Sequence, residues 1–326
     1  MALKMIGIEI GSDTLKMAVC VGGVVKKVAV ARMPEELVME GRITSTTAMV
    51  EFLKTTMKAN RISGGACALV IPSQHVISHR FTMPAVSDEE LRLNLPFEMR
   101  DFVGKESDQY IYDYVITNMK DNVLSVYSAA VRKDVMEEFY ATFKKAGLTL
   151  KIAVPVEMAW MNLLARVPNL PPKVCIVDVG YAYTRVNIFE NGNFVMGKSI
   201  ERGGALIDEC IASALDVDRY EARARKESND DKILAEKFCQ DAYQDLTIEI
   251  MKVLNFYAYS DSNSEVPLEH LYYSGGCSQI EALRTALLKG TDLVQHHAYQ
   301  LVNMGDNVSD LALYCALAAG ATCQQK

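Results

Sequence analysis

Short apolar runs fill the first part of the chain and predict β-strands. Residues 6–10, 15–21 and 24–31 are rich in β-branched residues, and glycine-containing turns separate them. The adjacent glycines Gly22 and Gly23 favour a tight hairpin between the last two runs, because glycine tolerates positive φ. The chain is therefore predicted to open with three strands joined by two short turns.

The same pattern returns in the second part of the chain. Residues 174–179, 184–189 and 194–200 are again apolar runs that turns separate. Independent hairpins that happen to align are one explanation, but three matches at one offset of 169 residues favour two related halves. The matched pairs, an acid, a turn glycine and a hairpin glycine, are Glu9 with Asp178, Gly11 with Gly180, and Gly23 with Gly192.

Apolar residues at helical spacing predict helices between and after these units. Ser87, which three acids follow, is typical of a helix N-terminus, and Pro96 is expected to interrupt or restart that helix. The longest helix is predicted over residues 230–259, where an apolar residue recurs at every fourth position. Acids flank this stripe, so packing against the core is favoured over a membrane-surface role. Further helices are predicted over residues 46–60, 133–146, 157–165 and 204–215.

Composition places the chain among folded proteins of about two domains. It has 326 residues, of which half are apolar and 23% are charged, and this balance excludes intrinsic disorder. The net charge of −7 argues against a nucleic-acid-binding surface, so no nucleic-acid partner is expected. No apolar run reaches the roughly 18 residues that a membrane-spanning helix needs.

The cysteines and the N-terminal residues both point to the cytoplasm. The eight cysteines form no Cys-x-x-Cys pair and mostly lie in apolar runs, which is typical of buried free thiols in a reducing compartment. Glu9 and Asp13 interrupt the stretch that would have to form the apolar part of a secretory signal. The five histidines show no metal-binding spacing.

Three glycine turns lie where a nucleotide site would need them. In the first, between residues 9 and 16, backbone N–H groups and the Ser12 hydroxyl can cradle phosphate oxygens, and Lys16 can neutralise phosphate charge. Glu9 can hold a magnesium-bound water. The second turn, residues 178–184, mirrors the first in the other half. Two such turns facing each other across a cleft would clamp a polyphosphate and one metal ion.

The third turn, residues 274–278, follows a predicted strand and precedes a helix. Its glycines allow close backbone approach to a purine or a ribose. None of the three turns is a Walker A loop, and each alone is common after a strand. Their order and spacing together favour nucleotide binding.

These turns resemble the phosphate-1, phosphate-2 and adenosine motifs of the actin-like ATPase superfamily. Over nearly its whole length the chain resembles the PilM family, the cytoplasmic actin-like components of type IV pilus assembly machines. Residues 79–91, 97–98 and 113–114 are similar to an insertion that PilM and FtsA carry in their first half. Residues 249–257 are similar to a PilM helix in the second half.

The resemblance implies an α/β actin-like ATPase fold, with two related halves around a nucleotide cleft, each built on a five-stranded sheet. The first half is expected over residues 1–171, with an inserted subdomain at about 78–149. The second half is expected over residues 172–326, with a small subdomain at about 203–268. A C-terminal helix at about 309–323 is expected to pack back on the first half.

The resemblance also implies ATP and Mg²⁺ as ligands, with magnesium held through water by Glu9 and Asp178. Lys226 matches the lysine of the family's ribose-contacting pattern. The candidate nucleotide-binding residues are Glu9, Gly11, Ser12, Asp13, Thr14, Lys16, Asp178, Gly180, Tyr181, Thr184, Gly203, Gly204, Lys226, Gly275, Gly276 and Cys277.

Several positions depart from the superfamily pattern and predict a site poorly equipped for hydrolysis. Asp13 adds an acid where a triphosphate would be repelled. Tyr181 is bulky where small residues are usual, and Arg223 replaces the ribose-contacting glutamate. Pro155 stands where a water-orienting aspartate is usual. Glu157 is a weak substitute as catalytic residue, and it is equally an ordinary acid at a helix start.

The family resemblance implies a scaffold rather than an enzyme, with at most slow ATPase activity. Such a scaffold binds ATP weakly and docks the cytoplasmic tail of a PilN-like inner-membrane protein, bound as an extended peptide by the first half and its insertion. It is expected in the cytoplasm, held at the inner face of the membrane through its partners. A pilus motor ATPase and self-association are further expected partners.

Two alternatives share the fold. An FtsA-like division filament usually ends in an amphipathic membrane-binding helix, and residues 324–326 offer none. A small-molecule kinase needs a catalytic base near the cleft, and the first half shows no acid with a clear placement for it.

Overall fold

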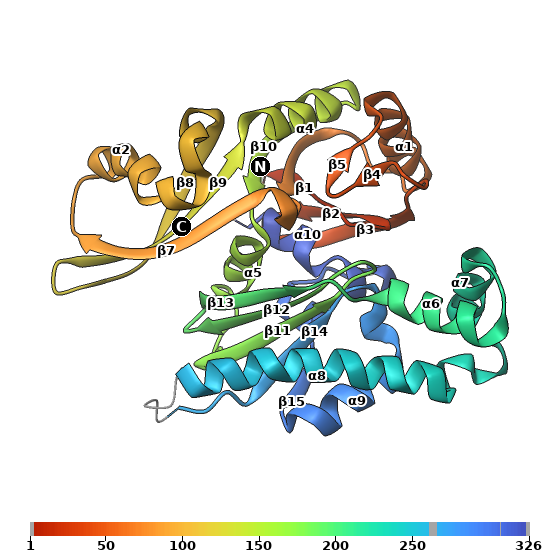
Figure 1. Ribbon diagram of the computed structural model, residues 1–326. Helices are drawn as coiled ribbons and strands as arrows, with labels where there is room; N and C mark the ends of the chain where they lie inside the picture. Colours follow the sequence, from red (N-terminus) through yellow and green to blue (C-terminus); the bar gives the residue numbers. More distant parts are fainter. Residues whose placement is uncertain (1–2, 261–265, 307, 324–326) are drawn as a thin grey trace.

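Two five-stranded sheets, one above the other in Figure 1, form the body of the molecule, and a smaller sheet projects from the upper one. The computed structural model describes residues 3–260, 266–306 and 308–323. Along these described ranges, no helix combines the length and the apolar character needed to cross a membrane.

The first sheet has the strand order β10-β6-β1-β2-β3. The central strand β1 pairs antiparallel with β2 and parallel with β6, so the sheet is mixed. Helices α1 and α4 cover one face, where Leu53 and Phe139 are fully buried against Ile8. The bounds are β1 Lys4–Ile10, β2 Thr14–Val21, β3 Val24–Arg32, β6 Gly65–Val70, β10 Leu148–Val154, α1 Thr46–Ala59 and α4 Lys133–Lys145.

The second sheet repeats this arrangement with the order β13-β12-β11-β14-β15. Its central strand β11 also pairs antiparallel with the next strand in the chain and parallel with a later one. The shared order and directions confirm the two related halves that the 169-residue offset predicts. The bounds are β11 Lys173–Val179, β12 Thr184–Glu190, β13 Asn193–Ile200, β14 His270–Ser274 and β15 Val294–His297.

Four helices accompany the second sheet. The longest, α8, begins at Lys237, so the prediction of a helix from residue 230 is wrong at its start. Asp231 and Lys232 adopt left-handed backbone conformations, and two such residues in succession cannot continue an α-helix. The bounds are α6 Gly204–Leu215, α7 Arg219–Ser228, α8 Lys237–Ser260 and α9 Glu281–Thr291.

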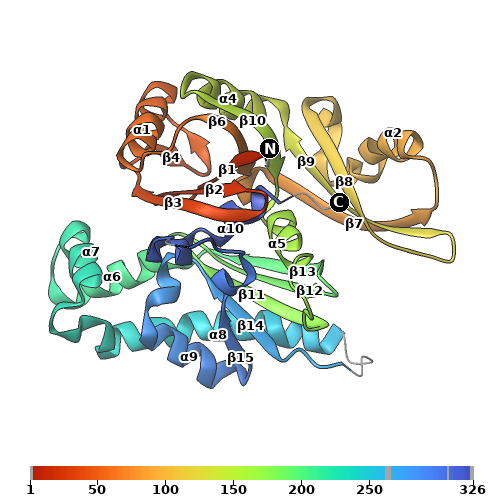
Figure 2. The ribbon, with the colours of Figure 1, turned by 180° about the vertical axis from the view of Figure 1, so that it is seen from behind.

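Two short helices, α5 (Val156–Leu164) and α10 (Ala316–Ala321), lie between the two sheets, as both ribbon views show (Figures 1 and 2). Glycines permit their close approach. A Cβ atom at Gly7 of β1 would lie 1.7 Å from the Ala318 carbonyl oxygen, and one at Gly320 would lie 2.3 Å from the Ala159 carbonyl oxygen. Trp160 of α5 is fully buried in this layer. Residues 324–326, which bear on the FtsA-like alternative, lie outside the described residues.

The projecting part is a three-stranded sheet of order β7-β9-β8 with helix α2 against it. Ser87 and Glu90 form a capping box at the start of α2, as the sequence predicts. The helix continues through Pro96 to Glu98, so the predicted interruption at Pro96 is wrong; a new helix starts at Arg100 instead. The bounds are β7 Val76–Pro84, β8 Tyr110–Lys120, β9 Val123–Arg132, α2 Asp88–Glu98 and α3 Arg100–Val103.

This projecting sheet, the insertion, also touches the second half. The Arg80 guanidinium donates a hydrogen bond of 2.6 Å to the Val195 carbonyl oxygen, and Tyr127 packs edge-on against Phe194. The remaining elements are β4 Val38–Met39, β5 Arg42–Ile43 and the 3-10 helices η1 Ser73–His75, η2 Gly104–Gln109, η3 Asp230–Ala235, η4 Gly276–Gln279, η5 Ala298–Leu301 and η6 Asp310–Tyr314.

Candidate functional site

The two related glycine turns face each other between the halves. In each turn the glycine N–H donates to the carbonyl oxygen three residues later: Gly11 to Thr14 at 3.0 Å, and Gly180 to Tyr183 at 2.9 Å. The tips also meet directly, because the Ala182 N–H donates to Ser12 Oγ at 3.2 Å. The strand–turn–strand units at the two chain positions therefore form one site.

A cavity of about 410 Å³ lies at this meeting point, within the range typical of small-molecule sites. Twelve of the sixteen candidate residues line it. Those twelve are Glu9, Gly11, Ser12, Asp13, Thr14, Lys16, Asp178, Gly180, Tyr181, Lys226, Gly276 and Cys277.

The other four candidates, outside the cavity lining, lie directly behind it. The Thr184 hydroxyl donates to the Arg202 carbonyl oxygen at 2.8 Å and so fixes the second turn. A Cβ atom at Gly203 would lie 2.5 Å from the Gly180 carbonyl oxygen, and one at Gly275 would lie 2.3 Å from that of Val179. Gly204 packs against Tyr181 in the same way. These positions need glycine, or a buried hydroxyl, for backbone packing around the site.

Each half places a buried acid–base pair at the root of its turn. Lys16 Nζ lies 2.7 Å from Glu9 Oε1, and Arg185 Nη1 lies 3.4 Å from Asp178 Oδ2. In both halves the partners are directly opposite in adjacent antiparallel strands. Arg185 is a site residue that the sequence reasoning missed. The offset of 169 residues, applied to Lys16, would have found it.

The two acids influence each other across the cleft. Burial raises the pKa of Glu9, Lys16 opposes this rise, and repulsion from Asp178 adds to it. The pKa of Lys16 is raised because attraction to Glu9 and Asp178 outweighs the effect of burial. Glu9 Oε2 is buried and accepts no hydrogen bond from the described residues. Two neighbouring carboxylates with an unused oxygen fit a hydrated Mg²⁺, which prefers oxygen ligands and keeps several waters.

Asp13 does not face the cavity as a free charge. Its Oδ2 lies 2.5 Å from Arg223 Nη2 of α7, so this ion pair joins the first half to the second. The repulsion toward a triphosphate that the sequence predicts is therefore largely balanced. Two departures from the superfamily pattern, Asp13 and Arg223, thus explain one another.

Three cations surround the ring of Tyr181. Arg223 lies 4.7 Å from the ring centroid, Lys226 lies 5.3 Å away and Arg219 lies 5.9 Å away. Lys226 also pairs with Asp208 at 2.5 Å. Burial raises the pKa of Tyr181, and the charge of Asp208 adds to the rise. Arg219 and Asp208 were missed, because nothing in their local sequence links them to the second turn.

The cations that line the cavity are all engaged by carboxylates. Lys16, Arg185, Arg223 and Lys226 each form an ion pair, and five carboxylates line the same space. An anionic ligand must therefore compete with internal acids for these cations. This arrangement supports weak anion binding and a need for a divalent cation.

Glu157, the weak catalytic candidate, lies in the first turn of α5 and outside the set of lining residues. It accepts a hydrogen bond of 3.3 Å from the hydroxyl of Tyr127, which belongs to the insertion. Burial raises the pKa of Glu157. Glu157 is therefore engaged with the insertion in this structure.

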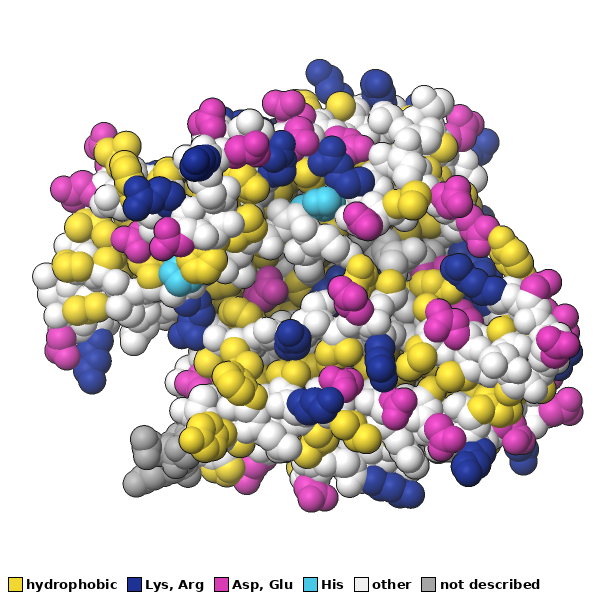
Figure 3. Space-filling model, viewed as in Figure 1, with side chains coloured by type: hydrophobic (Ala, Val, Ile, Leu, Met, Phe, Trp, Pro, Cys, Tyr) yellow, Lys and Arg dark blue, Asp and Glu magenta, His cyan; other side chains and the backbone are white. Residues whose placement is uncertain are grey.

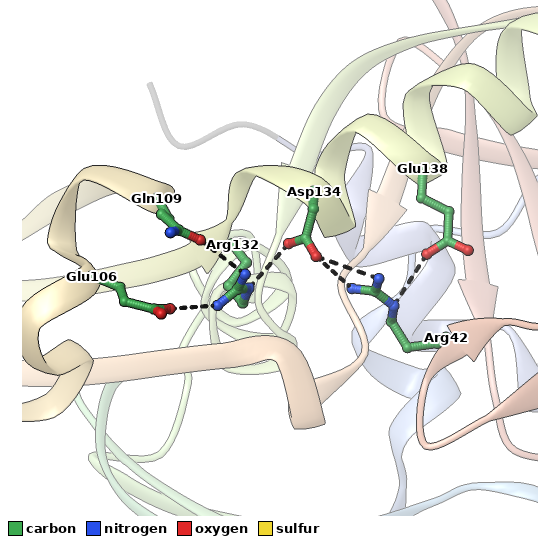
Figure 4. Close-up of polar contacts among 6 residues, drawn as sticks. All are labelled: Arg42, Glu106, Gln109, Arg132, Asp134 and Glu138. Carbon is green, nitrogen blue, oxygen red and sulfur yellow. Dashed lines mark hydrogen bonds and ion pairs between the residues drawn. The ribbon is translucent and has the colours of Figure 1, made fainter.

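A chain of charged contacts leads from the insertion to the cavity wall (Figure 4). Arg132, at the end of β9, contacts Glu106 at 2.9 Å and Asp134 at 3.1 Å. Asp134 also contacts Arg42 at 3.3 Å. Arg42 follows Gly41, which lines the cavity. The network therefore fixes the β4–β5 hairpin relative to the insertion.

Comparisons with known proteins agree with this architecture. A family model described as "Type IV pilus assembly protein PilM" matches residues 7–312. A search of curated proteins found no match. Solved structures at these low sequence identities show the fold, which is that of the actin-like ATPases.

Three solved structures illustrate the likeness. The "PilM-PilN type IV pilus biogenesis complex" has 18% identity and a TM-score of 0.83, covering 98% of each chain. The ethanolamine utilization protein EutJ from Carboxydothermus hydrogenoformans has 14% identity and a TM-score of 0.62, covering 99% of this chain and 90% of EutJ. MreB 5 of Spiroplasma citri bound to AMPPNP has 12% identity and a TM-score of 0.55, covering 98% of this chain and 95% of MreB.

Proposed function

Since this chain belongs to the PilM family of type IV pilus assembly proteins, we propose that it is a scaffold of a type IV pilus or related secretion machine. The observation that carries the proposal is the match of the family model over nearly the whole chain. The fold alone is shared with proteins of many functions, so it does not decide between a scaffold and an enzyme. The features of the site favour the scaffold.

The partner is the cytoplasmic tail of a PilN-like inner-membrane protein, which would hold the scaffold at the inner face of the membrane. A protein of very similar structure is solved as a complex with PilN. The insertion gives this chain a surface of its own, and apolar side chains show on its face in Figure 3. Leu93 and Phe97 on α2 are 66% and 71% exposed. A pilus motor ATPase and a second copy of the chain are further candidate partners.

The cleft binds ATP weakly and with magnesium. Lys16 and the two glycine turns would contact the phosphates, and Glu9 and Asp178 would hold the hydrated ion. Magnesium, when bound, neutralises phosphate charge that the paired cations of the site leave uncompensated. Turnover is near background, because Pro155 carries no water-orienting group and Glu157 is hydrogen-bonded to Tyr127.

The experiment is calorimetry with a synthetic peptide. The peptide is the cytoplasmic tail of the small membrane protein encoded beside this chain, and a scrambled peptide of equal composition is the control. We expect a dissociation constant in the micromolar range or below for the native tail alone. A folded protein that binds neither peptide, or both equally, would contradict the scaffold role.

A further inference from the structure

The part of the cleft that a nucleoside would enter is filled by the protein itself. A Cβ atom at Gly204 would lie 2.6 Å from Cys277 Sγ, 3.4 Å from Tyr181 Cδ2 and 3.5 Å from Lys226 Nζ. Gly204, Cys277 and Lys226 are three of the residues assigned from the sequence to the nucleotide site. They converge on the side chain of Tyr181 and leave no slot between them for a base and its ribose.

The ring of Tyr181 is held there by a second set of contacts. Arg223 stacks on it and is itself fixed by Asp13 at 2.5 Å and Glu227 at 3.2 Å. Arg223 is only 9% exposed, so this pairing is shielded from water and from salt. Because Asp13 lies on the first half and Arg223 on the second, the same contact closes the cleft over the ring.

The phosphate side of the cleft is different. The cavity of about 410 Å³ extends along both glycine turns and reaches Gly41 and Pro72 on its far wall. Lys16 and Arg185 lie at its floor with the acids Glu9 and Asp178. Space and cations are therefore present for a phosphate chain while the nucleoside side is closed.

We propose that Tyr181 is a plug of the nucleoside slot, held by the Asp13–Arg223 ion pair, so that the site in this state takes a magnesium-bound phosphate chain without its nucleoside. The inference rests on the proposed nucleotide binding and assigns its specificity. ATP gains contacts from its base and ribose only when the ring leaves and the ion pair opens. A slot that is open about a tenth of the time lowers the apparent affinity about tenfold.

Calorimetry with Mg-ATP and with Mg-pyrophosphate tests the plug. We expect the wild-type chain to bind both ligands with affinities within about threefold of each other. Tyr181→Ala should bind Mg-ATP about tenfold more tightly and leave the affinity for Mg-pyrophosphate unchanged. Asp13→Asn should shift ATP binding in the same direction, because it releases Arg223.

Two variants serve as controls for this experiment. Tyr181→Phe keeps the ring and should behave as wild type. Tyr183→Ala removes a neighbouring ring of the same turn, over which no cation stacks in the described structure, and should not raise ATP affinity. Thermal melting confirms that each variant is folded.

The possible failures are distinguishable. Wild-type affinity for Mg-ATP tenfold or more above that for Mg-pyrophosphate would overturn the plug while leaving nucleotide binding intact. Equal ATP affinity in wild type and folded Tyr181→Ala would also overturn it. Absence of binding of both ligands to every folded variant would overturn the plug together with the proposed nucleotide binding, and leave the docking of the tail untouched.

Discussion

Lys16 and Arg185 occupy equivalent positions in the two halves of the molecule. They are 169 residues apart in the chain, and each lies on the second strand of its half, opposite the acid that ends the central strand. Each forms an ion pair with that acid, at 2.7 Å and 3.4 Å. The duplicated fold thus carries a duplicated electrostatic unit, and the two copies meet at the cleft.

Removing one member of the buried pair should destabilise the fold strongly. Lys16→Met leaves Glu9 as an uncompensated buried charge, which costs about 3–5 kcal/mol of unfolding free energy. The control is Lys252→Met, which breaks the exposed pair with Glu249 and should cost at most about 1 kcal/mol. Urea denaturation measures both. Equal losses in the two variants would show that the Glu9–Lys16 pair is not the stabilising contact described.

The close contact between β1 and α10 should tolerate no side chain. Gly7→Ala places a methyl group 1.7 Å from the Ala318 carbonyl oxygen, so the helix must move away from the sheet. We expect a loss of several kcal/mol, on the order of 3 or more. Gly276→Ala, whose Cβ would meet no atom within 4 Å, is the control for stability. A melting temperature unchanged by Gly7→Ala would refute this packing.

His297 should make stability fall as the pH is lowered. Burial lowers its pKa to about 4, and the positive charge of Arg284 adds to the effect. Since the pKa is near 6.5 in the unfolded chain, protons bind preferentially to the unfolded state between pH 6.5 and 4. The stability present above pH 6.5 is then lost progressively, up to about 3 kcal/mol below pH 4. Urea denaturation of wild type and His297→Gln at pH 7, 5.5 and 4.5 tests this; parallel pH profiles would contradict it.

ATP turnover should stay near background even when magnesium is saturating. A placed water is as necessary for hydrolysis as bound phosphate, and positioning contributes roughly 7–11 kcal/mol to such barriers. Phosphate release should therefore be the same for wild type, Lys16→Ala and Asp178→Ala. Vigorous activity that either substitution reduces would restore an enzyme to consideration.

The exposed apolar face of α2 should contribute to docking of the membrane-protein tail. Leu93→Glu combined with Phe97→Glu introduces charge at two side chains that pack little in the structure, so folding should be preserved. We expect at least a tenfold loss of peptide affinity by calorimetry, since apolar anchors dominate most interfaces. The matched control is Ile248→Glu with Phe256→Glu on α8, which are 53% and 64% exposed. Undiminished binding by the α2 variant would exclude this face from the docking surface.

The strand–turn–strand units of both halves could be predicted from the sequence because their causes are local. Alternating β-branched residues, adjacent glycines and the recurrence of an acid two residues before a glycine act over fewer than thirty residues. The Ser87–Glu90 capping box is equally local, and so is the apolar stripe of α8. The same features carry the resemblance to the PilM family, which the family model confirms.

The contacts that decide how the cleft behaves could not be predicted in this way. Asp13 and Arg223 are 210 positions apart, and Tyr127 and Glu157 come from the insertion and the helix between the sheets. Only the packing of the halves brings such residues within hydrogen-bonding distance, since the charge and shape of a side chain do not specify a distant partner. Thus the sequence by itself determined the elements, the internal repeat and the candidate residues. The tertiary structure decided which charges neutralise one another and that the ring of Tyr181 fills the slot between them.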